Sequence, residues 1–234
     1  MVRALDILRN SWRLYRANGP LIVGYAAWLL LTAAAFVLTS FVQHEGARQL
    51  LLLAVQIVDV MLWMWVGIMV TLITIDANAG KQPGSARLPN DAWTLIVPFA
   101  WATVLQGLVV LGGLLLFLVP GCIFMVWFAF AQQAVVIDKK RGLDALTQSR
   151  ALCRGRFFAV TWYLFVGPFL VMLVYLLVLA MVFAAVAALT GTHIDVLFGD
   201  QPPLWMDITA SVGEIFLMPL IYVYWTLTYL ELKK

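Results

Sequence analysis

Residues 157–189 read FFAVTWYLFVGPFLVMLVYLLVLAMVFAAVAAL, a run of 33 residues without one charged side chain. A helix crosses the hydrocarbon core of a bilayer with about 20 apolar residues, so this run predicts a membrane helix with residues to spare. The pair Gly167–Pro168 suggests where the run divides, because proline is tolerated in the first turn of a helix. We therefore expect residues 157–166 to form an aromatic interfacial lead-in and the membrane helix to begin near Pro168.

Five further apolar stretches are long enough to span a bilayer, at residues 20–42, 49–75, 92–118, 121–137 and 207–230. Backbone groups cannot stay unpaired in lipid, so these stretches predict helices, and the two-residue alternation of a membrane barrel is missing from the sequence. Only residues 119 and 120 separate the third and fourth stretches, which predicts a tight turn at residues 119–121. The predicted fold class is an all-α integral membrane protein, a bundle of about six transmembrane helices.

The composition excludes a soluble protein. Of the 234 residues, 64% are hydrophobic and 12% are charged, whereas soluble domains have roughly 45–50% and 25%. Polar side chains would have to cover the exterior of a soluble chain, and this chain has too few of them. The net charge of +3 gives no reason to expect a nucleic-acid partner. Two isolated cysteines, Cys122 and Cys153, predict neither a disulfide nor a metal site.

The basic residues orient the chain, because lysine and arginine favour cytoplasmic loops. If the N-terminus is cytoplasmic, Arg48 is the one basic residue outside. The other fourteen then lie inside: Arg3, Arg9, Arg13, Arg16, Lys81, Arg87, Lys139, Lys140, Arg141, Arg150, Arg154, Arg156, Lys233 and Lys234. We predict that both termini are cytoplasmic and that the protein is a multi-pass protein of the bacterial inner membrane.

Two amphipathic segments, at residues 1–18 and 141–156, precede the first and fifth apolar stretches. In the first, Leu5, Leu8, Trp12 and Tyr15 recur at helical spacing, and Leu143, Leu146 and Leu152 belong to the second. Each segment predicts a helix in the inner headgroup layer, with its apolar stripe toward the acyl chains. We expect the arginines of both segments to bind lipid headgroups, in particular anionic ones. These arginines are Arg9, Arg13, Arg16, Arg150, Arg154 and Arg156.

The two amphipathic segments also match at a displacement of 138 residues. The pairs include Asp6 with Asp144, Ser11 with Ser149, and Arg16 with Arg154. Two interpretations stand, a parallel internal repeat or coincidence within a common helix type. The predicted organisation is one transmembrane domain over residues 1–234, with hairpins at 20–75, 92–137 and 157–230 beside the segments at 1–18 and 141–156.

The sequence resembles a bacterial family, the glycerophosphoryl diester phosphodiesterase membrane domain, together with YciC-like multipass inner-membrane proteins. The resemblance rests on short hydrophobic motifs along most of the chain. They are ILR at 7–9, LYR at 14–16, LVPG at 118–121, VVID at 135–138, AL at 145–146, SR at 149–150, RGRF at 154–157 and YLEL at 229–232. The resemblance implies architecture and an inner-membrane location. It implies no activity, because the phosphodiesterase activity of such fusions belongs to a separate soluble domain that we do not expect here.

Ionisable residues inside apolar stretches are the best candidate site, since charge is expensive at the bilayer centre. Asp59 and Glu214 each precede the end of their stretch by 16 residues, with Gln56 one turn before Asp59 and Gln106 in the third stretch. One interpretation is an intramembrane polar site that binds a proton, a cation or an amine. The other is that both acids are protonated and hydrogen-bonded, and hold helices together.

No nucleophile elbow, phosphate loop or paired-histidine zinc motif occurs in the sequence, so we predict no enzymatic activity and no cofactor. The favoured function is a non-enzymatic membrane protein that supports envelope organisation by binding lipids, a membrane-protein partner or a second copy of itself. The alternative is a small transporter or permease component that uses Asp59 and Glu214. A transporter needs a polar cavity at these two acids, whereas a scaffold needs only packed helices.

Overall fold

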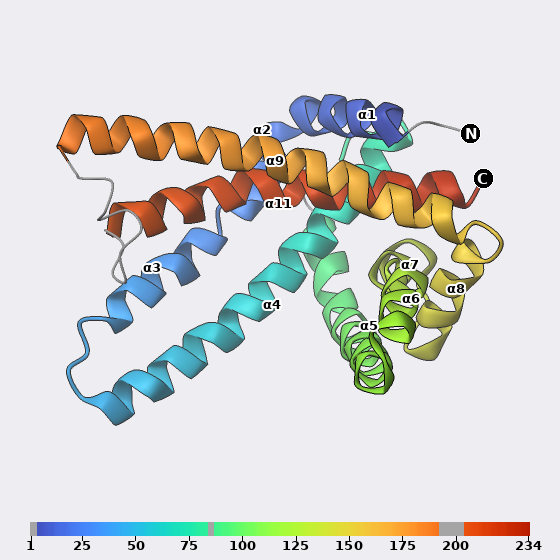
Figure 1. The fold of residues 1–234 in the computed structure, drawn as a ribbon, viewed down its shortest axis with the longest axis horizontal. Coiled ribbons are helices and arrows are strands. Elements are labelled where there is room, and N and C mark those ends of the chain that lie inside the picture. Colours follow the sequence, from blue (N-terminus) through green and yellow to red (C-terminus); the bar gives the residue numbers. More distant parts are fainter. Residues whose placement is uncertain (1–3, 84–86, 192–203) are drawn as a thin grey trace.

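The computed structural model describes residues 4–83, 87–191 and 204–234 (Figure 1). Every regular element in these ranges is a helix, as the apolar runs predict. The helices are α1 (Ala4–Ala17), α2 (Gly19–Ala26), α3 (Leu29–Thr39), α4 (Glu45–Asn78), α5 (Leu88–Leu116), α6 (Leu118–Phe128), α7 (Ala131–Asp138), α8 (Leu143–Cys153), α9 (Phe157–Thr190) and α11 (Leu204–Leu232).

Six helical segments of the described chain are long and apolar enough to cross a membrane, which confirms the predicted number. Two of them are built from two helices each, α2 with α3 over Gly19–Thr39, and α6 with α7 over Leu118–Asp138. The other four are α4, α5, α9 and the Ile208–Leu232 part of α11. The all-helical fold of a multi-pass membrane protein follows from these segments.

Helix α9 runs unbroken from Phe157 to Thr190, so no helix begins at Pro168 as the sequence suggested. The interfacial lead-in at residues 157–166 stays a prediction. The proline removes one backbone donor, and neighbouring helices can compensate such a loss in an apolar setting. The carbonyl that loses its helix donor is that of Leu164, four residues before Pro168. The Tyr224 hydroxyl of α11 donates to the neighbouring Tyr163 carbonyl oxygen at 2.8 Å. Gly167 leaves room for this tyrosine, since a β-carbon there would lie 2.1 Å from the Tyr224 ring.

The turn between the third and fourth spans is also shifted from its predicted place at residues 119–121. The chain reverses at Phe117, the one extended residue between α5 and α6. Pro120 therefore lies in the first turn of α6, where a missing backbone donor costs nothing. The two helices can approach closely here, because Gly113 faces the Gly121 backbone.

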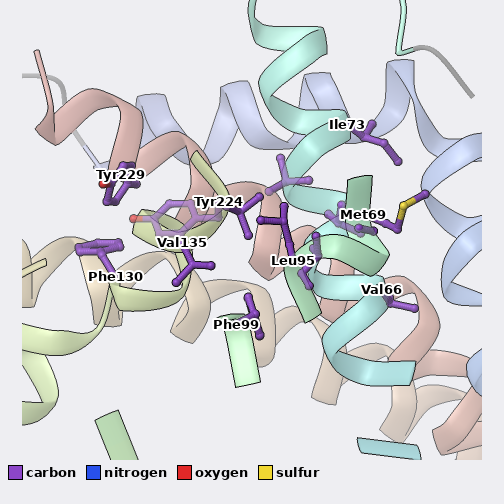
Figure 2. Packing of buried hydrophobic residues seen from close by; sticks show 14 of the residues in the cluster. Val66, Met69, Ile73, Leu95, Phe99, Phe130, Val135, Tyr224 and Tyr229 are labelled. Carbon is purple, nitrogen blue, oxygen red and sulfur yellow. The ribbon is translucent and has the colours of Figure 1, made fainter. Parts of the chain in front are cut away.

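The buried core lies toward the end of the molecule that carries both termini (Figure 1). Figure 2 shows side chains from α4, α5, α7 and α11 meeting there, among them Met69, Phe99, Val135 and Tyr224. At the opposite end the α3–α4 hairpin diverges from α9 and α11 (Figure 1). Apolar side chains at that end stay uncovered by protein; Leu189, for example, is 87% exposed. Such a surface suits lipid contact rather than water.

The end of α11 is tied to the end of α7 by polar contacts. The Tyr229 hydroxyl donates to one carboxylate oxygen of Asp138 at 2.6 Å, and the Lys233 ammonium group lies 2.5 Å from the other. The Tyr229 ring also packs edge-on against Phe130. These contacts join the central hairpin to the last span.

Helix α1 packs on the bundle through Ile7, Ser11 and Tyr15, which are buried. Leu5 and Trp12 of the predicted stripe are 59% and 50% exposed and do not pack on the bundle. The placement of this stripe against acyl chains stays a prediction. The polar Ser11 falls on the packed side because it bonds its own helix, donating to the Ile7 carbonyl at 2.8 Å.

Helix α8 packs against the break between α6 and α7. Its Ser149 hydroxyl accepts from the Phe130 amide at 3.1 Å and donates to the Trp127 carbonyl at 2.7 Å. The Cys153 thiol lies 3.4 Å from the Val126 carbonyl. A side chain from α8 thus bonds the backbone groups that the break in the fourth span releases. Ser11 and Ser149, paired in the sequence match, make different bonds, and the internal repeat stays a prediction.

Candidate intramembrane site

Asp59 of α4 and Glu214 of α11 line the same cavity, together with residues of α3. The cavity has a volume of about 880 Å³ and lies where the α3–α4 hairpin begins to diverge from α11. Both acids come from the less buried halves of their helices, since the buried residues of α4 begin at Trp65. The two acids that the sequence singled out are therefore close together in space.

Thr32 of α3 is the direct partner of Asp59. Its buried hydroxyl lies 2.5 Å from the Asp59 carboxyl group and 2.9 Å from the carbonyl oxygen of Leu29. A hydroxyl group has one hydrogen, so it can donate to only one of these acceptors at a time. When Asp59 is ionised, Thr32 donates to the carboxylate. When Asp59 is protonated, the acid donates to Thr32, and Thr32 donates to Leu29.

The charge balance of the cavity favours a cation. Its lining includes two carboxyl groups, and no Lys, Arg or His is among the described residues that form it. Glu214 forms no hydrogen bond or ion pair with any residue in the described ranges. Two carboxylates in a space of low dielectric repel each other, and a bound cation or a proton relieves that repulsion.

The remaining walls are mainly apolar. Side chains from all three helices contribute, among them Leu30, Phe36 and Val37 from α3, Trp63 from α4, and Ile208 and Ile215 from α11. The hydroxyl groups of Ser40 and Ser211 also line the cavity. An indole ring beside carboxylates is a setting in which organic cations bind, because the face of the ring attracts positive charge.

The two glutamines predicted for this site lie elsewhere, so this part of the prediction is corrected. Gln56 is exposed on α4 and does not line the cavity. Gln106 is on α5, which contributes no residue to the cavity, and its side-chain oxygen is buried without a hydrogen-bond partner in the described chain. The sequence analysis placed both glutamines by their depth along the spans. Depth does not tell which way a side chain points around the helix axis, and neither glutamine points into the cavity that Asp59 lines.

Thr32 and Ser211 belong to the site and were missed in the sequence. Each is a small hydroxyl residue within an apolar stretch, a type that commonly bonds its own helix backbone and gives little signal. The feature that could have drawn attention to Thr32 is a hydroxyl group in the span that forms a hairpin with the Asp59 helix.

The six arginines predicted to bind headgroups are all exposed. Arg150 lies over the Trp127 ring, with its guanidinium carbon 4.4 Å from the ring centroid. Arg150 and Arg154 line a groove of about 840 Å³, while Arg156 lines a separate, smaller cavity between α1, α9 and α11. Arg9, Arg13 and Arg16 lie along α1.

The described residues contain no cluster of three or more His, Cys, Asp or Glu side chains that could hold a metal ion. Both cysteines are free thiols. Burial raises the pKa of the Cys153 thiol on α8 to about 11, so it is protonated at neutral pH and unsuited to act as a nucleophile or metal ligand.

Residues 39–232 match a family described as a domain of unknown function, DUF7847. No curated protein and no solved structure matches the chain.

Proposed function

The chain belongs to the DUF7847 family, whose function is unknown, and we propose that it is a non-enzymatic membrane protein that binds an organic cation between Asp59 and Glu214. In this proposal it acts as a small transporter or as a component of a permease. The observation that carries the proposal is the shared cavity of about 880 Å³ that both carboxyl groups line.

The chemistry of the walls defines the ligand class. Carboxylates and an indole ring favour a positively charged group, and the apolar side chains of α3 and α11 favour a hydrocarbon body. A ligand with an ammonium or phosphonium centre and apolar substituents fits both. A fully hydrated inorganic ion would leave most of the wall without a matching partner.

Thr32 positions the Asp59 carboxyl group for the ligand. Its hydroxyl group lies between the Asp59 carboxyl group and the Leu29 carbonyl oxygen. When a cation enters, the Thr32 hydroxyl donates to the Asp59 carboxylate, which keeps its other oxygen for the cation. The Leu29 carbonyl oxygen still accepts its backbone hydrogen bond within the helix.

The cavity favours transport over the envelope scaffold that the sequence suggested. A scaffold requires packed helices, and two acids that serve only as packing partners would each be expected to bond a neighbouring helix. Asp59 has such a bond to Thr32, whereas Glu214 has none to the described residues. An inner-membrane location with both termini in the cytoplasm remains part of the proposal and rests on the distribution of lysine and arginine.

Binding of tetraphenylphosphonium to the purified full-length protein in lipid nanodiscs tests the proposal. Tetraphenylborate has nearly the same size and shape with the opposite charge, so it controls for apolar binding. We expect saturable binding of the cation above that of empty nanodiscs, and no such excess for the anion.

Two variants and a matched control assign the binding to the cavity. Asp59→Asn and Glu214→Gln should each weaken cation binding by about tenfold or more, because each removes a charge from a site of low dielectric. Gln56→Leu changes a polar residue on the same helix outside the cavity and should bind as the wild type does. Equal affinity in all four proteins, or equal binding of both ions, would show that the cavity is not a cation site.

A further inference from the structure

A second recess lies at the terminus-bearing end of the molecule, between α6, α8 and the start of α9. This groove has a volume of about 840 Å³, and its lining includes Trp127, Arg150, Arg154, Phe157 and Phe158. It is far along the chain from Asp59 and Glu214, and it shares no lining residue with their cavity.

The arginines of the groove are placed to receive an anion. Neither Arg150 nor Arg154 forms an ion pair with a described residue. The Arg150 guanidinium group stacks on Trp127, which holds the group in place by its face and leaves the donors along its edge available. Those edge donors match the oxygen atoms of a phosphate group.

The other side of the groove is apolar and open. Phe158, in the first turn of α9, is 87% exposed, and Phe157 and Ile123 complete the wall. In water this surface would be unfavourable, but it suits the upper part of an acyl chain. A ligand that fits the groove therefore has a phosphate at one end and hydrocarbon at the other.

Helix α1 provides a contrast. Its recess is lined by Arg9, Arg13, Arg16 and other residues of α1 alone, with Asp6 among them. No second helix lines this recess. Arg13 also lines a separate cavity of about 440 Å³ between α1, α4 and α11.

We propose that the groove binds one anionic phospholipid, with its phosphate between Arg150 and Arg154 and an acyl chain against Phe158 and Trp127. The site is independent of the cation cavity. Because α8 also bonds the backbone at the break in the fourth span, the bound lipid would lie against the helix that stabilises this break.

Native mass spectrometry of the full-length protein with lipid tests the site, using phosphatidylglycerol and phosphatidylcholine with the same acyl chains. We expect one phosphatidylglycerol molecule to be retained in preference to phosphatidylcholine. The double variant Arg150→Gln, Arg154→Gln should lower this retention by about thirtyfold, from about 1 kcal/mol for each arginine. Arg87→Gln, Arg141→Gln removes the same charge from two exposed arginines outside the groove and is the matched control.

Phe158→Ser tests the apolar wall without a change of charge. Because this side chain is exposed, folding should be unaffected and lipid retention should fall several-fold. Millimolar inorganic phosphate should not displace the lipid if the acyl chain contributes. Equal losses in the two arginine variants, full retention in the Arg150/Arg154 variant, or displacement by phosphate alone would each overturn the proposal.

Discussion

Replacement of Ser149 by alanine removes a side chain that bonds both sides of the break in the fourth span. The Ser149 hydroxyl accepts from the Phe130 amide at 3.1 Å and donates to the Trp127 carbonyl at 2.7 Å, and the residue is fully buried. The methyl group of alanine can replace neither bond. The Phe130 amide is left without a partner in a buried setting, and the Trp127 carbonyl keeps only a long contact of 3.9 Å from the Cys153 thiol.

The structure sets the expected size of the effect. A buried polar group left without its partner costs about 1–3 kcal/mol. The losses at this amide and this carbonyl, partly relieved by small local movements, should lower the free energy of unfolding by about 2–4 kcal/mol. Ser11→Ala is the matched control, because Ser11 is equally buried but bonds only the Ile7 carbonyl of its own helix. That carbonyl keeps its backbone hydrogen bond within the helix, so Ser11→Ala should lower the free energy of unfolding by only about 0.5–1 kcal/mol.

The assay is reversible unfolding in mixed dodecylmaltoside and dodecylsulfate micelles, followed by tryptophan fluorescence. The shift in midpoint gives the change in free energy if the slope stays constant. Ser149→Thr, which keeps the hydroxyl group, should recover part of the loss. A Ser149→Ala effect no larger than that of Ser11→Ala would refute the assignment of Ser149 to the break.

Two further predictions concern orientation and the buried thiol. Cysteine introduced at Lys234 should react with an impermeant maleimide only from the cytoplasmic side, and at Gly46 only from the outer side; the reverse pattern would contradict the topology. Since burial raises the pKa of Cys153 to about 11 from its ordinary 9.0, its modification in a Cys122→Ser background should be slow at pH 8 and rise about tenfold per pH unit toward pH 11. The protonated thiol is favoured in the folded state, so its contribution to the free energy of unfolding is present below pH 9 and is lost as the pH rises through 11. Rapid modification of Cys153 at pH 8 would show that the thiol is not buried.

The six spans could be predicted because each depends on its own composition and length, which any apolar run of about 20 residues displays. The breaks within the first and fourth spans could not. Ala129 and Phe130 have no local feature that ends a helix, and the Ser149 hydroxyl that bonds the released backbone comes from 19 residues further along the chain. A break of this kind depends on packing between helices, which local sequence does not specify.

In the candidate site, too, local sequence revealed some residues, whereas others depend on how the helices pack. Asp59 and Glu214 could be identified because a charge within an apolar run is rare and costly. Thr32 gave no comparable signal, although it is the residue that bonds Asp59. Gln106 gave a signal but lies on α5, outside the cavity. The rotation of each helix about its axis decides which polar residues meet, and a helix exposed to lipid on several sides has no clear apolar face from which to read it.

The most direct test of the cation site is a crystal structure of the protein with tetraphenylarsonium, whose arsenic atom gives an anomalous signal. We predict one arsenic peak in the cavity between the Asp59 and Glu214 carboxyl groups, and no peak there in the Asp59→Asn, Glu214→Gln double variant under the same conditions. A cavity without arsenic at a saturating concentration of the cation, or a peak that persists unchanged in the double variant, would contradict the account.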